Sequence, residues 1–203
     1  MDIKQLDWNK MKGLIPAIVQ DGSTGRVLML GFMNEEALEK TLESRRVTFW
    51  SRSRETLWTK GETSGNYLQL EEVRHDCDKD ALIVVAEPQG PCCHRGTLSC
   101  FAGDDEFNGL EFLGYLERLI ASRKEEMPEG SYTSALFAKG LLEIAKKVGE
   151  EAIEVVLSSG QEKKRSIEES ADLLYHLLVF LTQREITLQD VVEELRSRSR
   201  KTG

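Results

Sequence analysis

The apolar pattern of this chain changes its period near residue 108, and no other feature constrains the fold as strongly. Upstream, short β-branched, aromatic or alternating runs predict strands at residues 26–33, 47–51, 67–73 and 81–87. Downstream, every periodic segment is helical, at residues 110–124, 131–158, 166–184 and 187–199. A mostly β half followed by an all-helical half predicts two domains. We expect a mixed α+β, mainly β, domain over residues 1–108 and an all-α helical bundle over residues 109–203.

Two helix starts carry capping signals. Asn34 precedes the acid-rich segment "EEALEKTLESR" and is expected to be its N-cap. Thr187 and Asp190 have the spacing of a capping box at the last predicted helix.

Composition limits the class of protein. The 203 residues are 40% hydrophobic, which is enough for a buried core, and the net charge of -8 argues against a general nucleic-acid binder. We expect no membrane-spanning segment, since no apolar run is long enough, and no secretory signal in "MDIKQLDWNKMKG". The expected location is cytoplasmic, where the four cysteines stay reduced and are available to a metal or to catalysis.

The stretch "RHDCDKDA" places Asp76, Asp78 and Asp80 on alternate positions around Cys77. On an extended segment the three carboxylates would share one side, and the thiol would face the other. Carboxylates suit Mg²⁺ and thiolates suit zinc, so one short strand could present two metals. A calcium loop is rejected because Ala81 stands where that loop needs glycine. A solvated acidic face stays open as the alternative.

Cys77, Cys93 and Cys100 can supply three thiolates. Three protein ligands leave a fourth zinc position for water, which is typical of a catalytic zinc. If His94 were the fourth ligand, the zinc would be structural, and four unligated buried cysteines are a further alternative. Cys92 is next to Cys93, and neighbouring cysteines rarely both bind one ion.

The predicted helices carry two pairs of acids three residues apart, Glu151 with Glu154 and Glu169 with Asp172. Each pair shares a helix face, and Glu151 and Glu169 lie on the apolar stripes of their helices. A carboxylate facing a core is unfavourable unless it is paired or bound to metal, so we predict a four-carboxylate Mg²⁺ site. Chance pairs on solvated faces are the alternative.

The first half resembles the phosphoribosyl-AMP cyclohydrolase family in "RHDCDKDAL", "GPCCHRGTLSCF" and "FWSRSRETLWTKGETSGN". The resemblance implies zinc on Cys77, Cys93 and Cys100, shared across a homodimer interface, and Mg²⁺ on the three aspartates. It implies hydrolytic opening of the adenine N1–C6 bond by zinc-activated water. His94 is the candidate general base, with a supporting role beside the metal as the alternative. Candidate phosphate and ribose contacts are Arg52, Ser53, Lys60, Thr63, Ser64 and Asn66.

The second half resembles the phosphoribosyl-ATP pyrophosphohydrolase family, of the all-α nucleotide pyrophosphatase type, in "SYTSALFAKG" and "KVGEEAIE…ESADLLYHLL". This resemblance implies Mg²⁺ on the four paired acids, a triphosphate substrate and release of pyrophosphate. The whole chain resembles the bifunctional histidine-biosynthesis enzymes, which implies two consecutive reactions on small-molecule nucleotides. A structural zinc module fused to a helical dimerisation bundle is the alternative. A cytidine-deaminase-like zinc enzyme is excluded because His-x-Glu and Pro-Cys-x-x-Cys are absent.

Overall fold

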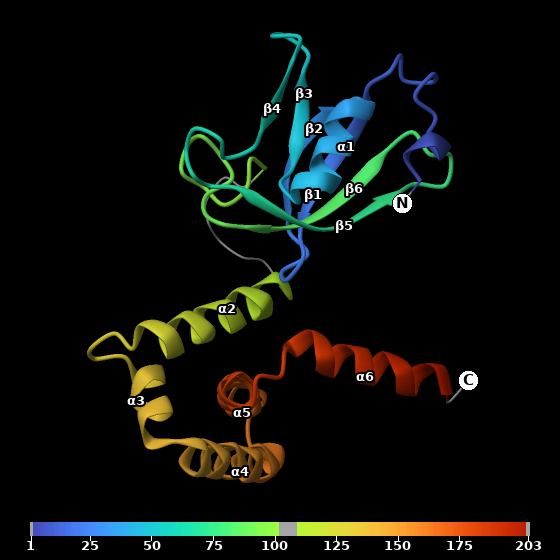
Figure 1. The fold of residues 1–203 in the computed structure, drawn as a ribbon. Coiled ribbons are helices and arrows are strands. Elements are labelled where there is room, and N and C mark those ends of the chain that lie inside the picture. The colour runs from blue at the N-terminus through green and yellow to red at the C-terminus, as the bar shows by residue number, and fades with distance from the viewer. Residues whose placement is uncertain (1, 102–108, 202–203) are drawn as a thin grey trace. The chain divides into compact units, whose positions relative to one another are not determined.

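The computed structural model describes residues 2–101 and 109–201, and the chain divides into two compact units, Met1–Glu111 and Phe112–Gly203 (Figure 1). The described strands all belong to the first unit, and the described part of the second unit is helical. This strand-rich and helical layout agrees with the prediction, whereas the boundary predicted at residue 108 lies outside the described residues. None of the described helices is both long enough and apolar enough to cross a membrane.

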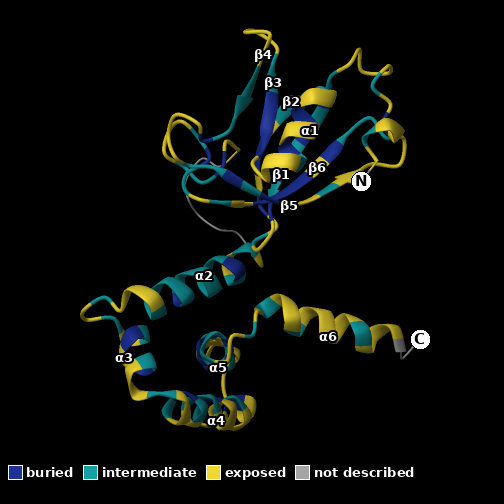
Figure 2. Cartoon of the chain, viewed as in Figure 1, coloured by how far each residue is buried: buried dark blue, intermediate teal, exposed yellow. Residues whose placement is uncertain are grey.

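The first unit is built on a four-stranded sheet in the order β2-β1-β6-β5. Its strands are β1 (Ile15–Asp21), β2 (Val27–Met33), β5 (Leu68–His75) and β6 (Leu82–Pro88). β1 runs parallel to β6, and the two outer pairs are antiparallel. Because β1 and β6 are the central strands, both are largely buried (Figure 2). The turn from β5 precedes β6 at one end of that strand. The segment that carries Cys92, Cys93 and Cys100 follows β6 at its other end.

Helix α1 (Glu35–Ser44) and the hairpin of β3 (Thr48–Ser51) and β4 (Thr56–Thr59) pack beside β2. A short 3-10 helix, η1 (Ile3–Gln5), precedes them. The N-cap prediction is confirmed, since the Asn34 side chain accepts the Ala37 N–H at 2.8 Å. Gly31 is required where β2 meets the hairpin, because a Cβ there would lie 2.3 Å from the Phe49 ring.

Two strands were missed by the sequence prediction, β1 and β4. In β1, every second residue from Ile15 to Asp21 is buried, but the intervening positions include Pro16 and Ile18, which hide the alternation. β4 is four residues long and becomes a strand through its antiparallel pairing with β3. Such short segments take their structure from a partner rather than from their own pattern.

The second unit consists of helices α2 (Glu111–Glu126), α3 (Tyr132–Lys139), α4 (Leu141–Leu157), α5 (Lys163–Gln183) and α6 (Leu188–Lys201), with a 3-10 turn, η2 (Ser158–Gly160), after α4. The capping box at α6 is confirmed. The Thr187 N–H donates to Asp190 Oδ2 at 2.8 Å, and the Asp190 N–H donates to Thr187 Oγ1 at 3.1 Å. The buried core of this unit comprises Ile120, Leu136, Ile144, Leu178 and Val179.

The single long helix predicted over residues 131–158 is wrong, because the structure has two helices there. Gly140 separates α3 from α4 with φ +86° and ψ 175°, a conformation that essentially only glycine adopts. The break lets α3 turn away from α4 while α4 continues alongside α5 (Figure 1). An apolar period alone could not reveal this break, because both helices keep the same spacing of apolar residues.

Candidate active sites

Asp76, Asp78 and Asp80 lie in the turn between β5 and β6, not on an extended segment. The expectation that the carboxylates and Cys77 occupy opposite faces of a strand is therefore wrong. The turn reverses at Lys79, whose φ is +63°, and Asp76 Oδ1 accepts the N–H groups of Asp80 at 3.0 Å and Ala81 at 3.2 Å. The three aspartates nevertheless meet, with one oxygen from each within 4.8 Å of the others.

Lys10 already places a cation at this aspartate turn. Its ammonium contacts the carboxylates of Asp78 and Asp80, and these contacts raise the pKa of Lys10. The segment that carries Lys10 is also attached to the turn, since the Asp7 N–H donates to the Lys79 carbonyl at 2.9 Å. The oxygen donors and their partner Lys10 are consistent with a site that attracts a hard cation such as Mg²⁺.

A cavity of about 460 Å³ lies next to the cysteines that follow β6. It brings together several residues singled out from the sequence: Lys60, Ser64, Asn66, Cys93, His94 and Cys100, with Cys92 beside them. Three others, Arg52, Ser53 and Thr63, are exposed and lie outside this lining. The Arg52 guanidinium instead stacks on the Phe32 ring, 3.8 Å from its centroid.

The thiols at this cavity differ in their electrostatic surroundings. The Arg95 main-chain N–H and the Thr97 hydroxyl bond to the Cys93 sulfur and lower the pKa of its thiol. Burial raises the pKa of Cys100, and burial raises the pKa of Cys92 to about 12. Because metals bind the thiolate form, Cys93 is the best prepared of the three as a zinc ligand and Cys92 the worst.

Cys77 does not join the other thiols within one chain. It lies in the turn before β6, whereas Cys93 and Cys100 follow that strand, whose seven residues span about 20 Å. Among the described residues, the clusters able to hold a metal with three donors contain carboxylates and no cysteine. Cys93 and Cys100 do interact with each other, which is consistent with two adjacent sulfur donors for zinc.

The helical unit contains the second cluster. One oxygen each from Glu151 on α4 and from Glu169 and Asp172 on α5 lie within 4.8 Å of one another. Glu151 and Glu169 are buried, and Asp172 is exposed. Glu154, also on α4, bonds to the Glu169 side chain, so all four predicted acids gather here. Oxygen donors from two helices fit Mg²⁺.

Glu169 is the most constrained member of the helical cluster. Burial, followed by the Glu154 side chain, raises the pKa of its carboxyl. Arg165, one turn earlier on α5, forms an ion pair with Glu169 that partly offsets this effect. Two neighbouring acids stay outside the cluster: Glu168 is exposed and pairs with Lys164 and Arg165, and Glu150 pairs with Lys147 at 2.8 Å.

Three residues that contact these clusters, Lys10, Arg165 and His176, were not predicted as site residues, and neither was Tyr132, which contacts His176. Lys10 is 68 residues from Asp78 in sequence, so no local pattern could have linked them. Arg165 and His176 carry one usable signal, because each lies four residues, or one helical turn, from an acid of the cluster.

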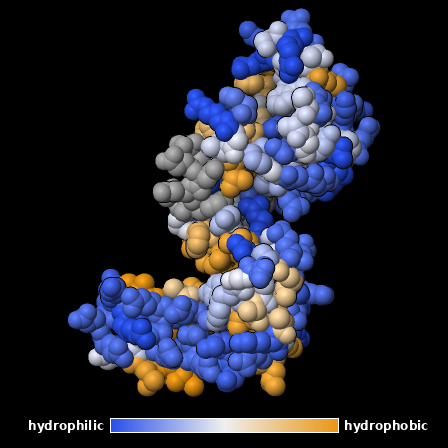
Figure 3. Space-filling model, turned by 90° about the vertical axis from the view of Figure 1, so that its left-hand side faces the viewer, coloured by the Kyte–Doolittle hydropathy of each residue, from blue (hydrophilic) through white to orange (hydrophobic). Residues whose placement is uncertain are grey.

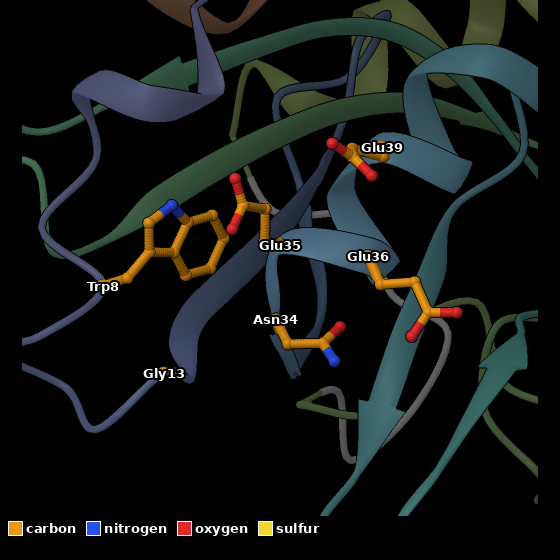
Figure 4. Close-up of a pocket in the computed structure, with 6 residues that line it drawn as sticks. All are labelled: Trp8, Gly13, Asn34, Glu35, Glu36 and Glu39. Atoms are coloured by element: carbon orange, nitrogen blue, oxygen red, sulfur yellow. The ribbon is translucent and has the colours of Figure 1, made fainter.

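A separate cavity of about 540 Å³ lies between Trp8 and the start of α1 (Figure 4). The Trp8 ring faces Glu35, and Glu36 and Glu39 complete an acidic wall. Glu35 and Glu36 lie in the first turn of α1, where the helix dipole stabilises acids, so their presence has a structural cause. Their charge also disfavours phosphate-bearing ligands, and we assign no substrate to this cavity.

Comparisons with known proteins agree with both halves of this description. Residues 29–102 match the phosphoribosyl-AMP cyclohydrolase family model, and residues 113–199 match the phosphoribosyl-ATP pyrophosphohydrolase family model. The chain is 50% identical over 204 residues to the histidine biosynthesis bifunctional protein HisIE of Photobacterium profundum, covering 98% of this chain and 99% of the relative. The protein of the same name from Escherichia coli K12 is 52% identical over 196 residues, covering 96% of each chain.

A strand-rich unit with thiols and a helical unit with clustered carboxylates define a two-domain, metal-dependent hydrolase. The chain belongs to the family of bifunctional histidine-biosynthesis proteins that join a phosphoribosyl-AMP cyclohydrolase to a phosphoribosyl-ATP pyrophosphohydrolase. It is accordingly a bifunctional enzyme of that pathway.

Proposed function

We propose that the helical domain, residues 109–203, hydrolyses phosphoribosyl-ATP to phosphoribosyl-AMP and pyrophosphate. The domain of residues 1–108 then opens the adenine ring of that product at its N1–C6 bond. The observation that carries this proposal is the separation of donors: sulfur at the cavity of the first unit, and carboxylates alone between α4 and α5. Sulfur and oxygen donors select different ions, so the two steps take place at two distinct sites.

In the helical domain, Glu151, Glu154, Glu169 and Asp172 would hold Mg²⁺. When bound, the ion supplies charge neutralisation for a triphosphate and for the leaving pyrophosphate. Asp172 is exposed while Glu151 and Glu169 are buried, so the substrate would approach from the Asp172 side. The buried acids fix the site, because both are anchored on helices that pack against each other.

In the first domain, Cys77, Cys93 and Cys100 would hold zinc, which when bound lowers the pKa of a coordinated water to about 7. His94 is the proposed general base. Its ring is exposed at the cavity, and Nδ1 lies 3.8 Å from the sulfur of Cys93. A base beside a metal ligand is well placed to accept a proton from the attacking water.

The remaining polar residues of this domain are proposed to bind the nucleotide. Lys60, Ser64 and Asn66 line the cavity and would contact the ribose and an inner phosphate. Arg52, Ser53 and Thr63 are exposed outside that lining, so we assign them to the solvent-side phosphate. Mg²⁺ at Asp76, Asp78 and Asp80 would add positive charge near the β5–β6 turn.

We propose that the functional enzyme is a cytoplasmic homodimer in which one zinc site is shared between chains. The separation of Cys77 from Cys93 and Cys100 supports a shared site, because a second copy can supply the missing sulfur. The helical domain also carries exposed apolar residues on α4, among them Leu142, Ile153 and Val156, at 86%, 62% and 69% exposure. Apolar surface of this kind gathers on the helical unit (Figure 3) and is typical of a protein interface.

The shared zinc site is testable with two inactive variants. Cys77→Ser and Cys93→Ser should each abolish ring opening, while pyrophosphate release from phosphoribosyl-ATP persists. When the two variants are unfolded and refolded together, mixed dimers contain one intact site, so about a quarter of the wild-type ring-opening activity should return. No recovery in dimers shown by native mass spectrometry to be mixed would contradict the shared site. Loss of folding in Cys77→Ser would instead favour a structural zinc module.

A further inference from the structure

His176 is a buried histidine beside the carboxylate cluster. It is 5% exposed, whereas the other two histidines, His75 and His94, are exposed. It lies on α5 one helical turn after Asp172. An imidazole is stable at such a depth only if its nitrogen atoms have hydrogen-bond partners, so those partners indicate what the ring does.

The two hydrogen bonds of His176 determine its tautomer. Nδ1 lies 2.9 Å from the main-chain oxygen of Asp172, and a carbonyl oxygen can only accept. Nδ1 therefore carries the hydrogen. In the neutral ring Nε2 is then an acceptor, and the Tyr132 hydroxyl, 3.1 Å away, donates to it. Both ring nitrogens are satisfied, and they face different helices.

The Nδ1–H of His176 also faces the carboxylate cluster. Glu151 Oε1 lies 3.6 Å from Nδ1, which is too long for a hydrogen bond but close enough for the N–H dipole to attract the carboxylate. The same nitrogen is thus held against the backbone of α5 at Asp172 and against a carboxylate of α4. One ring thus lies against two of the residues that would bind the ion.

Tyr132, on α3, is itself braced against α5. Its ring stacks on Tyr175, with centroids 6.2 Å apart and planes inclined by 28°. The Tyr175 hydroxyl hydrogen-bonds to Thr133 Oγ1 at 2.7 Å. Because α3 ends at Gly140, it is a separate helix that can carry this contact while α4 carries Glu151. Tyr132 is therefore held where its hydroxyl can donate to Nε2 of His176.

We propose that His176 is a positioning residue of the pyrophosphohydrolase site. Its Nδ1–H holds Glu151 and the backbone of Asp172 at the separation that a divalent ion needs, and Tyr132 keeps the hydrogen on Nδ1. The inference rests on the proposed Mg²⁺ role of the carboxylate cluster. Groups that orient metal ligands in this way typically change metal affinity by about 10- to 100-fold when they are removed.

The test uses two matched variants of the full chain, because each amide mimics one ring nitrogen. The His176→Asn variant keeps an N–H donor at the Nδ1 position and loses the acceptor for the Tyr132 hydroxyl. The His176→Gln variant keeps an acceptor for Tyr132 at the Nε2 position and loses the Nδ1 donor. Mn²⁺ serves as the probe, and broadening of the backbone amide signals of Glu169 and Asp172 reports binding at this cluster. The Mg²⁺ concentration for half-maximal pyrophosphate release is measured in parallel, with ring opening as the internal control.

We expect His176→Gln to weaken Mn²⁺ binding at α5 by at least about tenfold and His176→Asn to stay within about threefold of wild type. The half-maximal Mg²⁺ concentration should shift in the same way, and ring opening should not change. Equal Mn²⁺ affinities in both variants and wild type, or equal losses in both variants, would overturn the role of Nδ1. Absence of Mn²⁺ broadening in the wild type would overturn the metal site itself, and the inference with it.

Discussion

The two carboxylate clusters are built in opposite ways. The aspartate turn gathers Asp76, Asp78 and Asp80 within five residues of chain, whereas the helical cluster needs α4 and α5 to pack together. The turn is mostly exposed, and the helical cluster buries Glu151 and Glu169. A carboxylate cluster can thus be a local or a tertiary property of the chain, and the two kinds respond differently to mutation.

A basic side chain contacts each cluster. Lys10 contacts Asp78 and Asp80 from an N-terminal segment, and Arg165 contacts Glu169 from the same helix. Repulsion among three close carboxylates is reduced in this way without a metal. A divalent ion must therefore compete with a resident cation at both sites.

The largest expected effect separates the two clusters by function. Asp172→Asn replaces one carboxylate of the helical cluster with a neutral amide. It should reduce pyrophosphate release from phosphoribosyl-ATP by at least about 100-fold, because the cluster loses a charged ligand for Mg²⁺. Ring opening of phosphoribosyl-AMP should be unchanged. Glu168→Gln, an exposed acid on the same helix, is the matched control and should leave both reactions near wild type. A comparable loss in the control would contradict the assignment.

Gly140 should matter to the helical cluster and not to the turn. Gly140→Ala meets no atom within 4 Å, so its effect is backbone strain at φ +86°, about 1–3 kcal/mol of the free energy of unfolding. We expect the helical circular dichroism signal at 222 nm to be lost at a lower urea concentration. Pyrophosphate release should need a higher Mg²⁺ concentration to reach half its maximal rate. Gly149→Ala, inside α4 with no atom within 4 Å of the added methyl, should instead stabilise by about 0.5–1 kcal/mol. Equal effects of both changes would refute the strain argument.

Lys10 should set the metal affinity of the aspartate turn. Lys10→Gln removes the competing ammonium and should tighten Mg²⁺ binding there by about fivefold, a typical size for one charge contact at a surface. The backbone amide signals of Asp80 and Ala81, which bond to Asp76, report binding at this turn alone. Lys12→Gln, with the same change in charge, is the control. An unchanged affinity in Lys10→Gln would show that the ammonium does not compete with the ion.

The smallest expected effect is a pH dependence that belongs to the helical cluster. The pKa of Glu169 is raised above the ordinary value of 4.5, so the protonated carboxyl favours the folded state. This stabilisation is complete below about pH 4.5 and is lost as the pH rises through the raised pKa. Thermal melting of the metal-free chain at 222 nm should show this decline, and Glu169→Gln should remove it. A decline of the same size in Glu169→Gln would assign it to other groups.

Much of the local structure followed from the sequence, because its causes are local. The caps at Asn34 and Thr187 were predicted, since a capping side chain bonds to the backbone two or three residues away. β1 was missed because its burial depends on pairing with β6, more than sixty residues later. The break at Gly140 was missed because the apolar spacing continues through it.

The candidate sites were predictable in composition and less so in geometry. The alternation of Asp76, Asp78 and Asp80 was noticed, but the reason offered for it was wrong, since a turn and not a strand brings the carboxylates together. The helical acids were found because helical phase follows directly from residue spacing. Lys10 and Tyr132 could not be found, because their contacts depend on tertiary packing.

We propose that sulfur and oxygen donors serve two separate reactions on one chain. The most direct measurement incubates the enzyme with phosphoribosyl-ATP and Mg²⁺ and follows pyrophosphate and ring-opened product separately, first with zinc chelated and then with zinc restored. Chelation should stop ring opening, phosphoribosyl-AMP should accumulate while pyrophosphate release continues, and added zinc should restore the second step. Loss of both activities together, or of neither, would contradict this proposal.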